Sequence, residues 1–267
     1  MNLKDISTQL LFTTAPLWAE IAGKTSSATA FFYNAPVPGT TDQSIPLLVT
    51  NRHAIAGANR VVVEFIERKG DQPDTEHRLL VDIDPALLLR FSDASLDLAV
   101  APIGGLLNER EVAGKPLFFR SIDPSLVPSE KAISELSALE EIVFIGYPSG
   151  LRDAKNSNPL IRRGITATPV WNHFQGHPAF LIDAGVFPGS SGSPVFILNQ
   201  GAYATGDGLT VGNRILFLGV VYETMVRSAG SEVFLGLGKV VRSDVTIDFL
   251  NSVAKQLVTP PPEAVLG

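Results

Sequence analysis

The sequence contains no cysteine, and only four of its 267 residues are histidine. Without cysteine the chain can form no disulfide bond, no thiolate metal site and no thiol nucleophile. No apolar run approaches the roughly 18 residues that a membrane-spanning helix needs. Basic residues are also few, since 21 Lys and Arg stand against 27 Asp and Glu, for a net charge of −6. This balance argues against a nucleic acid partner, and the apolar pattern argues against a membrane protein.

The first residues lack the apolar core that a signal peptide requires. A short apolar stretch near the start is interrupted by Thr13, Thr14 and Pro16. Together with the absence of cysteine, this predicts cytoplasmic localisation in a bacterium. A secreted form from which the signal has already been removed is the alternative.

Most of the regular secondary structure that the sequence predicts is β-strand. Hydrophobic residues make up 45% of the chain and charged residues 18%, which is typical of a soluble globular protein with a sizeable core. A helical pattern near the C-terminus, with Ser243 or Asp244 as its N-cap, precedes a proline-rich tail. The predicted strands are residues 17–21, 29–33, 45–50, 60–68, 78–83, 161–170, 179–182, 195–198 and 215–221, and the predicted C-terminal helix is residues 243–257. A polar loop is predicted at residues 69–76, a solvated surface loop at 149–158, and a long hairpin loop between the strands 195–198 and 215–221.

A turn rich in glycine and serine, GVFPGSSGSPVF at residues 185–196, is the centre of the chain's organisation. Gly189 and Gly192 permit backbone conformations that aim successive N–H groups at one point. If the hydroxyl of Ser191 attacked a carbonyl there, the N–H groups of Gly189 and Ser191 would be placed to stabilise the resulting oxyanion. The alternative interpretation is an ordinary hairpin turn.

Two upstream segments supply the groups that would activate such a serine. His53 lies in VTNRHAI and Asp97 in DLAVAPI, each at the edge of an apolar, strand-like run. Asp93 is the rival carboxylate. Asp97 is favoured because its apolar flank can bury it beside His53, whereas Asp93 lies among small residues that are typical of a turn.

These three segments, with PGSSGSP as the third, resemble in sequence and order the signature segments of the trypsin-like (chymotrypsin-fold) serine peptidases, in particular the bacterial branch. The resemblance spans about residues 27–249. It implies an all-β fold of two six-stranded antiparallel Greek-key β-barrels, with the active site in the cleft between them and a C-terminal α-helix. Residues 1–115 would form the barrel that carries His53 and Asp97. Residues 116–258 would form the barrel that carries Ser191 and the closing helix, and residues 259–267 the tail.

The resemblance also implies the activity. A serine endopeptidase would use a triad of His53, Asp97 and Ser191, pass through an acyl-enzyme intermediate, and hold the oxyanion on the N–H groups of Gly189 and Ser191. It would need no cofactor and would act on protein or peptide substrates. The resemblance assigns the specificity pocket to Gly185, Pro188, Ser190, Leu218, Gly219 and Val220.

Two positions of that pocket depart from the digestive members of the family. Gly185 stands where members that select basic side chains carry an aspartate, so a small or apolar substrate side chain is expected. Ser190 stands where digestive members carry the aspartate that receives a freed N-terminus. We therefore expect no N-terminal activation switch, and any regulation to work through a partner, contacts between copies, or movable loops.

Three other interpretations compete. The double barrel would be a catalytically silent or activator-dependent binding or scaffold protein. An esterase-like hydrolase is disfavoured because a strand, and not a helix, follows Ser191. A metal site at His173 and His177 is disfavoured because Gly176 and Pro178 interrupt the helix that would align them.

Overall fold

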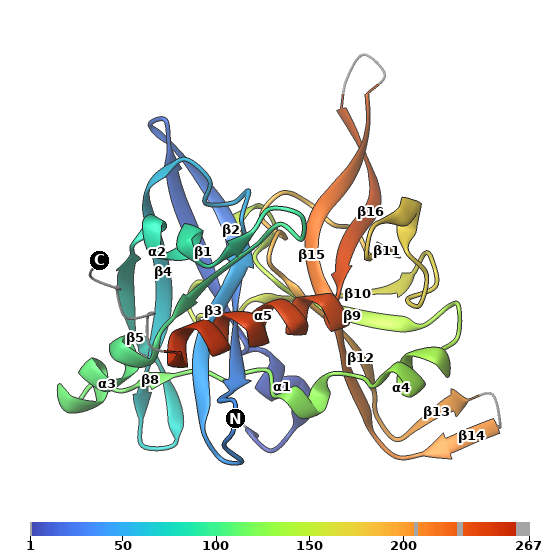
Figure 1. Cartoon of the computed structure of the whole chain (residues 1–267), viewed down its shortest axis with the longest axis horizontal. Helices are drawn as coiled ribbons and strands as arrows, with labels where there is room; N and C mark the ends of the chain where they lie inside the picture. The colour runs from blue at the N-terminus through green and yellow to red at the C-terminus, as the bar shows by residue number, and fades with distance from the viewer. Residues whose placement is uncertain (1, 206–207, 229–231, 260–267) are drawn as a thin grey trace, which may run out of the picture.

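Two β-structures lie side by side, with a long C-terminal helix across the boundary between them (Figure 1). The structure is a computed structural model that describes residues 2–205, 208–228 and 232–259. Within those residues no helix is both long and apolar enough to cross a membrane.

The N-terminal half is an eight-stranded sheet with the order β5-β4-β1-β2-β3-β7-β6, in which β8 also pairs with β4. Its strands are β1 (Thr14–Ile21), β2 (Lys24–Pro36), β3 (Ser44–Asn51), β4 (Ala58–Lys69), β5 (Gln72–Ile83), β6 (Ser92–Asp93), β7 (Leu98–Pro102) and β8 (Leu117–Phe118). The sequence predicted a polar loop over residues 69–76, but β4 and β5 pair as far as Lys69 and Gln72, so the connection is a tight turn.

Backbone pairing among the described residues does not confirm a closed barrel in this half. The sheet ends at β5 on one side and at β6 on the other. A short helix, α2 (Pro85–Arg90), lies between these two strands in the chain, and β6 has only two residues. The described edges therefore stay unpaired with each other.

The C-terminal half is a closed six-stranded barrel with the order β10-β11-β16-β15-β12-β9, which confirms the barrel expected there. A separate hairpin, β13 with β14, lies between β12 and β15, where the sequence predicted a long loop; Gly206 of that predicted loop is outside the described residues. The strands of this half are β9 (Glu141–Gly146), β10 (Leu160–Thr166), β11 (Ala179–Asp183), β12 (Pro194–Asn199), β13 (Ala202–Thr205), β14 (Gly208–Val211), β15 (Arg214–Ser228) and β16 (Glu232–Arg242).

Besides α2, the described residues form the helices α1 (Ile6–Leu10), α3 (Gly104–Val112), α4 (Glu130–Ser134) and α5 (Ser243–Val258), with 3-10 turns at Pro124–Leu126, Pro148–Gly150 and Phe174–Gly176. Helix α5 confirms the predicted C-terminal helix, although Arg242 and not Ser243 or Asp244 is its N-cap. Helix α3 was not predicted, because it has no buried residue and so no apolar face to detect. The predicted tail lies, beyond Thr259, outside the described residues.

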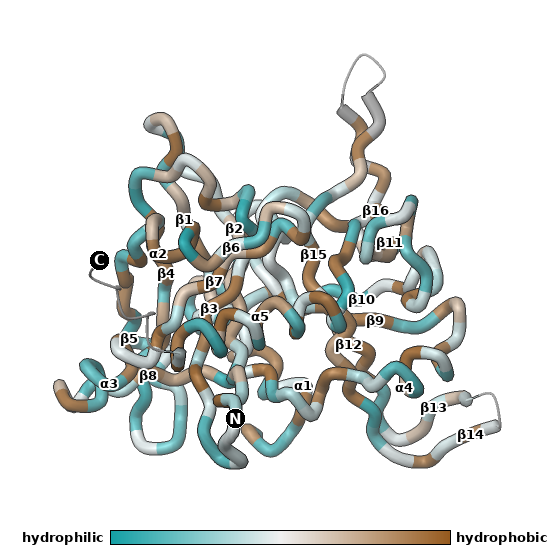
Figure 2. Tube along the Cα trace, viewed as in Figure 1, coloured by the Kyte–Doolittle hydropathy of each residue, from teal (hydrophilic) through white to brown (hydrophobic). Residues whose placement is uncertain are grey.

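Three hydrophobic clusters form the core, one in each half and one shared. In the shared cluster, Leu250 and Val253 of α5 join Tyr33 and Val49 of the N-terminal sheet and Phe217 of the barrel. Hydrophobic segments accordingly run through the middle of both halves and alternate with hydrophilic ones along α5, whereas many of the outer connections are hydrophilic (Figure 2). The two halves are thus joined by a common apolar core, and packing in this core fixes how the two halves lie against each other.

Candidate active site

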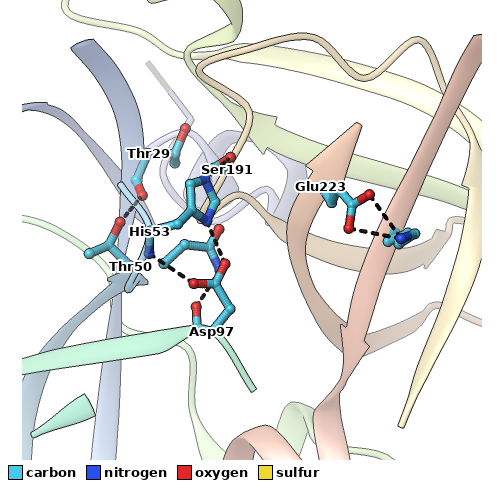
Figure 3. A network of polar contacts seen from close by, with 8 residues as sticks. Thr29, Thr50, His53, Asp97, Ser191 and Glu223 are labelled. Carbon is cyan, nitrogen blue, oxygen red and sulfur yellow. Dashed lines mark hydrogen bonds and ion pairs between the residues drawn. The ribbon is translucent and has the colours of Figure 1, made fainter. Parts of the chain in front are cut away.

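His53, Asp97 and Ser191 meet where the two halves join (Figure 3). Pairing of β3 with β7 places Asn51 opposite Leu98, and this register brings Asp97 beside His53. The Nδ1 atom of His53 lies 2.5 Å from Oδ2 of Asp97, and its Nε2 atom lies 3.1 Å from Oγ of Ser191. The three side chains therefore form one hydrogen-bonded line.

Asp97 is fixed by its backbone as well as by its carboxylate. Its φ of +55° is in the left-handed region, which a non-glycine residue adopts only when its surroundings require it. The carbonyl oxygen of Asp97 accepts hydrogen bonds from the N–H of Arg52, at 3.0 Å, and from Nδ2 of Asn51, at 2.8 Å. Its Oδ1 accepts from the N–H of His53 at 2.8 Å, so both carboxylate oxygens are committed to His53.

Asp93, the rival carboxylate, lies in a turn, as its small neighbours predicted. Its Oδ1 accepts hydrogen bonds from the N–H groups of Ser95 and Leu96 and from the hydroxyl of Ser95. These bonds, chiefly that of the hydroxyl, lower the pKa of the Asp93 carboxyl. Asp93 therefore stabilises a local turn and makes no hydrogen bond to His53.

The turn that carries Ser191 packs so closely against β2 and against the chain after β9 that a β-carbon would clash at two positions. At Gly192, with φ +88°, a β-carbon would lie 1.9 Å from the carbonyl oxygen of Thr29. At Gly189, with φ +89°, it would lie 2.6 Å from the carbonyl oxygen of Tyr147. The N–H of Thr29 donates to the carbonyl of Ser191 at 2.8 Å, and that contact fixes the turn on the N-terminal sheet.

Two N–H groups of this turn remain available. The carbonyl of Pro188 accepts a hydrogen bond from the N–H of Ser149 at 2.6 Å. In a trans peptide the C=O and the N–H point in opposite directions, so the N–H of Gly189 points away from Ser149. No acceptor among the described residues bonds the N–H of Gly189 or of Ser191.

A cavity of about 530 Å³ opens beside His53 and Asp97. One wall carries Glu223, whose two carboxylate oxygens each accept a hydrogen bond at 2.8 Å from Nζ of Lys239. Burial raises the pKa of Tyr222 on the same wall, and the carboxylates of Glu223 and Asp97 add to that effect. The lining residues are His53, Ala94, Ser95, Asp97, Phe174, Gln175, His177, Tyr222, Glu223 and Lys239.

None of the six residues assigned to the specificity pocket lines this cavity. The side chains of Leu218 and Val220 are fully buried in the barrel, as is Ser190, whereas Pro188 is exposed. A β-carbon on Gly185 would lie 2.5 Å from Nη2 of Arg162. Gly219, with φ +148°, lies against the carbonyl of Val241 and offers no side chain.

Sequence reasoning missed most of the cavity wall. His177 was considered only with His173 as a metal ligand, and the described residues contain no cluster of three or more metal-ligating side chains. The pair of Glu223 and Lys239 was also missed, because the two residues come from different strands and no short motif links them. The one available signal was Tyr222, which follows the apolar run of β15.

Comparisons with known proteins bear on the family and the fold of the chain. The family model of the trypsin-like peptidase domain matches residues 28–203. No curated protein sequence matches the chain.

Among solved structures, the chain is similar to the HtrA-type protease AlgW with a tripeptide, at 17% identity and a TM-score of 0.53, over 93% of this chain and 62% of that one. A second AlgW structure gives 16% identity and a TM-score of 0.53, over 96% and 64%. The Rv3671c protease from M. tuberculosis, in its active form, gives 18% identity and a TM-score of 0.49, over 96% and 85%. The chain thus spans less than two thirds of the AlgW chains, and the two AlgW comparisons support the fold.

Proposed function

The chain belongs to the trypsin-like peptidase family, and from this premise we propose that it is a serine endopeptidase whose chemistry is carried by His53, Asp97 and Ser191. The observation that carries the proposal is the unbroken line of hydrogen bonds from Asp97 through His53 to Ser191. A nucleophile, a base and a group that orients the base are the parts that such a mechanism requires.

Each residue has one role in the proposed reaction. Ser191 Oγ attacks the carbonyl carbon of the scissile bond while Nε2 of His53 takes the hydroxyl proton. Asp97 holds the Nδ1–H tautomer and stabilises the imidazolium that forms. His53 then gives the proton to the leaving amine, and an acyl-enzyme remains on Ser191. Water, deprotonated by His53, hydrolyses this ester and frees the serine.

The N–H groups of Gly189 and Ser191 are the proposed oxyanion hole. Their support is that both belong to the turn of the nucleophile and that neither has an acceptor among the described residues. Removing one such donor typically costs about 3 kcal/mol of transition-state stabilisation. An oxyanion formed at the carbonyl under attack would accept both hydrogen bonds.

The proposed substrate is a polypeptide that occupies the cavity beside His53, with Tyr222 and Glu223 on its wall. We propose that the pocket beside Gly185 prefers a small or apolar side chain of the substrate. Its support is the guanidinium of Arg162, which lies against Gly185 and would repel a basic substrate side chain. Cleavage of reporter peptides ending in Ala, Val or Leu should exceed cleavage of those ending in Arg or Lys, and the reverse order would contradict this preference.

Two wider proposals rest on the sequence. The N-terminal sheet is the counterpart of a first barrel, with residues 1–115 and 116–258 as the two domains. The protein acts in the bacterial cytoplasm, under the control of a partner, contacts between copies, or a movable loop.

The experiment that tests the activity is cleavage of an unfolded protein by the purified chain. We expect the wild-type chain to produce fragments, and Ser191→Ala and His53→Ala to produce none above background. Ser252→Ala, which changes an exposed serine of α5, is the matched control and should cleave like the wild type. A folded wild-type chain that cleaves nothing would contradict the proposal and favour the silent or activator-dependent scaffold.

A further inference from the structure

Residues 149–158, which we call the strap, connect the 3-10 turn at Pro148–Gly150 with β10. Their polar sequence predicted a solvated surface loop. The structure instead attaches the strap at two places, one beside Ser191 and one on strands β1 and β4 of the N-terminal sheet. The strap therefore links the turn of the nucleophile to the other half of the molecule.

At its start the strap fixes the peptide between Pro188 and Gly189. The N–H of Ser149 holds the Pro188 carbonyl at 2.6 Å, and this bond directs the N–H of Gly189 to the opposite side. Gly189 has no β-carbon to prevent its peptide from rotating. The carbonyl of Gly189 also accepts a hydrogen bond from Oγ1 of Thr29 at 3.1 Å, but only the bond from the strap acts directly on the peptide that carries the N–H of Gly189.

Further along, Arg152 anchors the strap to the N-terminal sheet. Nη1 of Arg152 forms an ion pair with Oε1 of Glu64 on β4, and its guanidinium lies 5.2 Å from the ring centroid of Trp18 on β1. Trp18 is paired with Val62 in register, so Trp18 and Glu64 are diagonal neighbours on one face of the sheet. The side chain of Glu64 is only 8% exposed and that of Arg152 only 19%, so this ion pair is largely shielded from water.

A shielded carboxylate is costly unless a cation is paired with it, and removing the cation leaves that cost uncompensated. Glu64 therefore holds Arg152 strongly. A second bond, from Nη2 of Arg78 to the carbonyl of Lys155 at 2.9 Å, keeps the far end of the strap on the same sheet.

We propose that Arg152 and Glu64 are positioning residues of the oxyanion hole: their ion pair, covered by Trp18, holds the strap on the N-terminal sheet and so fixes the N–H of Gly189 through Ser149. This inference rests on the proposed peptidase activity. It makes the activity depend on a contact between the two halves that lies outside the cavity and touches no substrate.

The test is Arg152→Met, which removes the charge and keeps the length of the side chain. We expect kcat to fall about 10- to 100-fold, below the full loss of an oxyanion donor, while KM stays within about twofold. Inhibition by a peptide boronate, whose adduct resembles the transition state, should weaken by the same factor as kcat. Arg152→Lys, which restores a cation beside Glu64, should recover part of the loss.

Arg60→Met is the matched control. It breaks an ion pair with Asp82 that is on the same sheet but exposed on both sides, and we expect its kcat to equal that of the wild type. If Arg152→Met does not fold, the same measurements are made on Glu64→Gln, which removes the charge of the carboxylate at nearly constant volume and should lower kcat at a similar KM.

Three outcomes would overturn the inference. They are an unchanged kcat in a folded variant, a rise of KM at constant kcat, and an equal loss in Arg60→Met. These results would leave the proposed function intact. An inactive wild-type chain would instead refute the proposed function itself, and this inference with it.

Discussion

Asp97 commits both oxygens of its carboxylate to His53, one to the backbone N–H and one to the ring. These two hydrogen bonds determine how the side-chain amide of an asparagine at position 97 would be oriented. The backbone N–H of His53 would retain the carbonyl oxygen of an asparagine, so the NH₂ group would face Nδ1. His53 would then carry its proton on Nε2, and that nitrogen could no longer accept the proton of Ser191.

Asp97→Asn should therefore lower kcat about 10⁴-fold, the size of the effect in the well-studied serine peptidase template, while the chain stays folded. Asparagine tolerates the left-handed backbone of this position, so the thermal unfolding temperature should change little. Steady-state kinetics and a thermal melt check both parts. Asp93→Asn, at the rival carboxylate, should retain activity, and an equal loss in that variant would contradict the assignment.

The buried hydroxyl of Tyr33 should make the free energy of unfolding fall at alkaline pH. Burial raises the pKa of its hydroxyl to about 12, and the charge of Asp123 adds to the effect. Above its ordinary pKa of about 10, the unfolded chain releases this proton while the folded chain retains it, so the free energy of unfolding falls as pH rises. The contribution is complete below pH 10 and is lost between pH 10 and 12.

In Tyr33→Phe this fall should be shallower by up to about 1.4 kcal/mol per pH unit. Urea denaturation at pH 9 and pH 11 measures the difference. If the free energy of unfolding falls equally between pH 9 and pH 11 in the wild type and the variant, Tyr33 does not keep its proton in the folded state.

At the scale of an element, the turn around Ser191 was predictable because its chemistry is local. Glycine spacing indicated where the backbone must turn, and the apolar run after it indicated β12. The strap was not predictable in the same way. Its polar residues read as solvated, since the contact that buries Arg152 joins residues 88 positions apart and leaves no periodic pattern.

Gly192→Ala should disrupt this turn. The added β-carbon would lie 1.9 Å from the carbonyl of Thr29, and β2 cannot retreat because the N–H of Thr29 is bonded to Ser191. We expect the free energy of unfolding to fall by about 2–4 kcal/mol and cleavage to fall more than about 100-fold.

Gly23→Ala is the control for Gly192→Ala, because Gly23 has a similar φ of +75° with nothing within 4 Å of the added carbon. It should cost only about 1–2 kcal/mol, from the backbone conformation alone. Equal losses in the two variants would exclude the steric contact as the cause.

For the whole molecule, the decisive feature is the hydrophobic cluster that α5 shares with both halves. The sequence predicted α5 from its apolar spacing, and it predicted the closed C-terminal barrel. The expected first barrel is not confirmed, since no pairing among the described residues connects β5 with β6, and pairing between strands so far apart in the chain leaves no local pattern in the sequence. The shared cluster implies that the halves unfold together.

Leu250→Ala tests this coupling. Leu250 is fully buried in the shared cluster, so truncation should lower the free energy of unfolding by about 2–5 kcal/mol. The chain has two tryptophans, Trp18 in the N-terminal sheet and Trp171 in the C-terminal half. Trp18→Phe and Trp171→Phe backgrounds therefore report on one half each. Both denaturation midpoints should move together, and movement of only one would contradict a common core.

The proposed mechanism requires that His53 activates Ser191. Its most direct test is labelling of the intact chain with a fluorophosphonate, followed by mass spectrometry of the labelled peptide, because this reports on the nucleophile without requiring a known substrate. We expect a single adduct on Ser191 that disappears in Ser191→Ala and in His53→Ala, and persists in Ser252→Ala. An absent adduct in the folded wild-type chain, or one that survives His53→Ala undiminished, would contradict it.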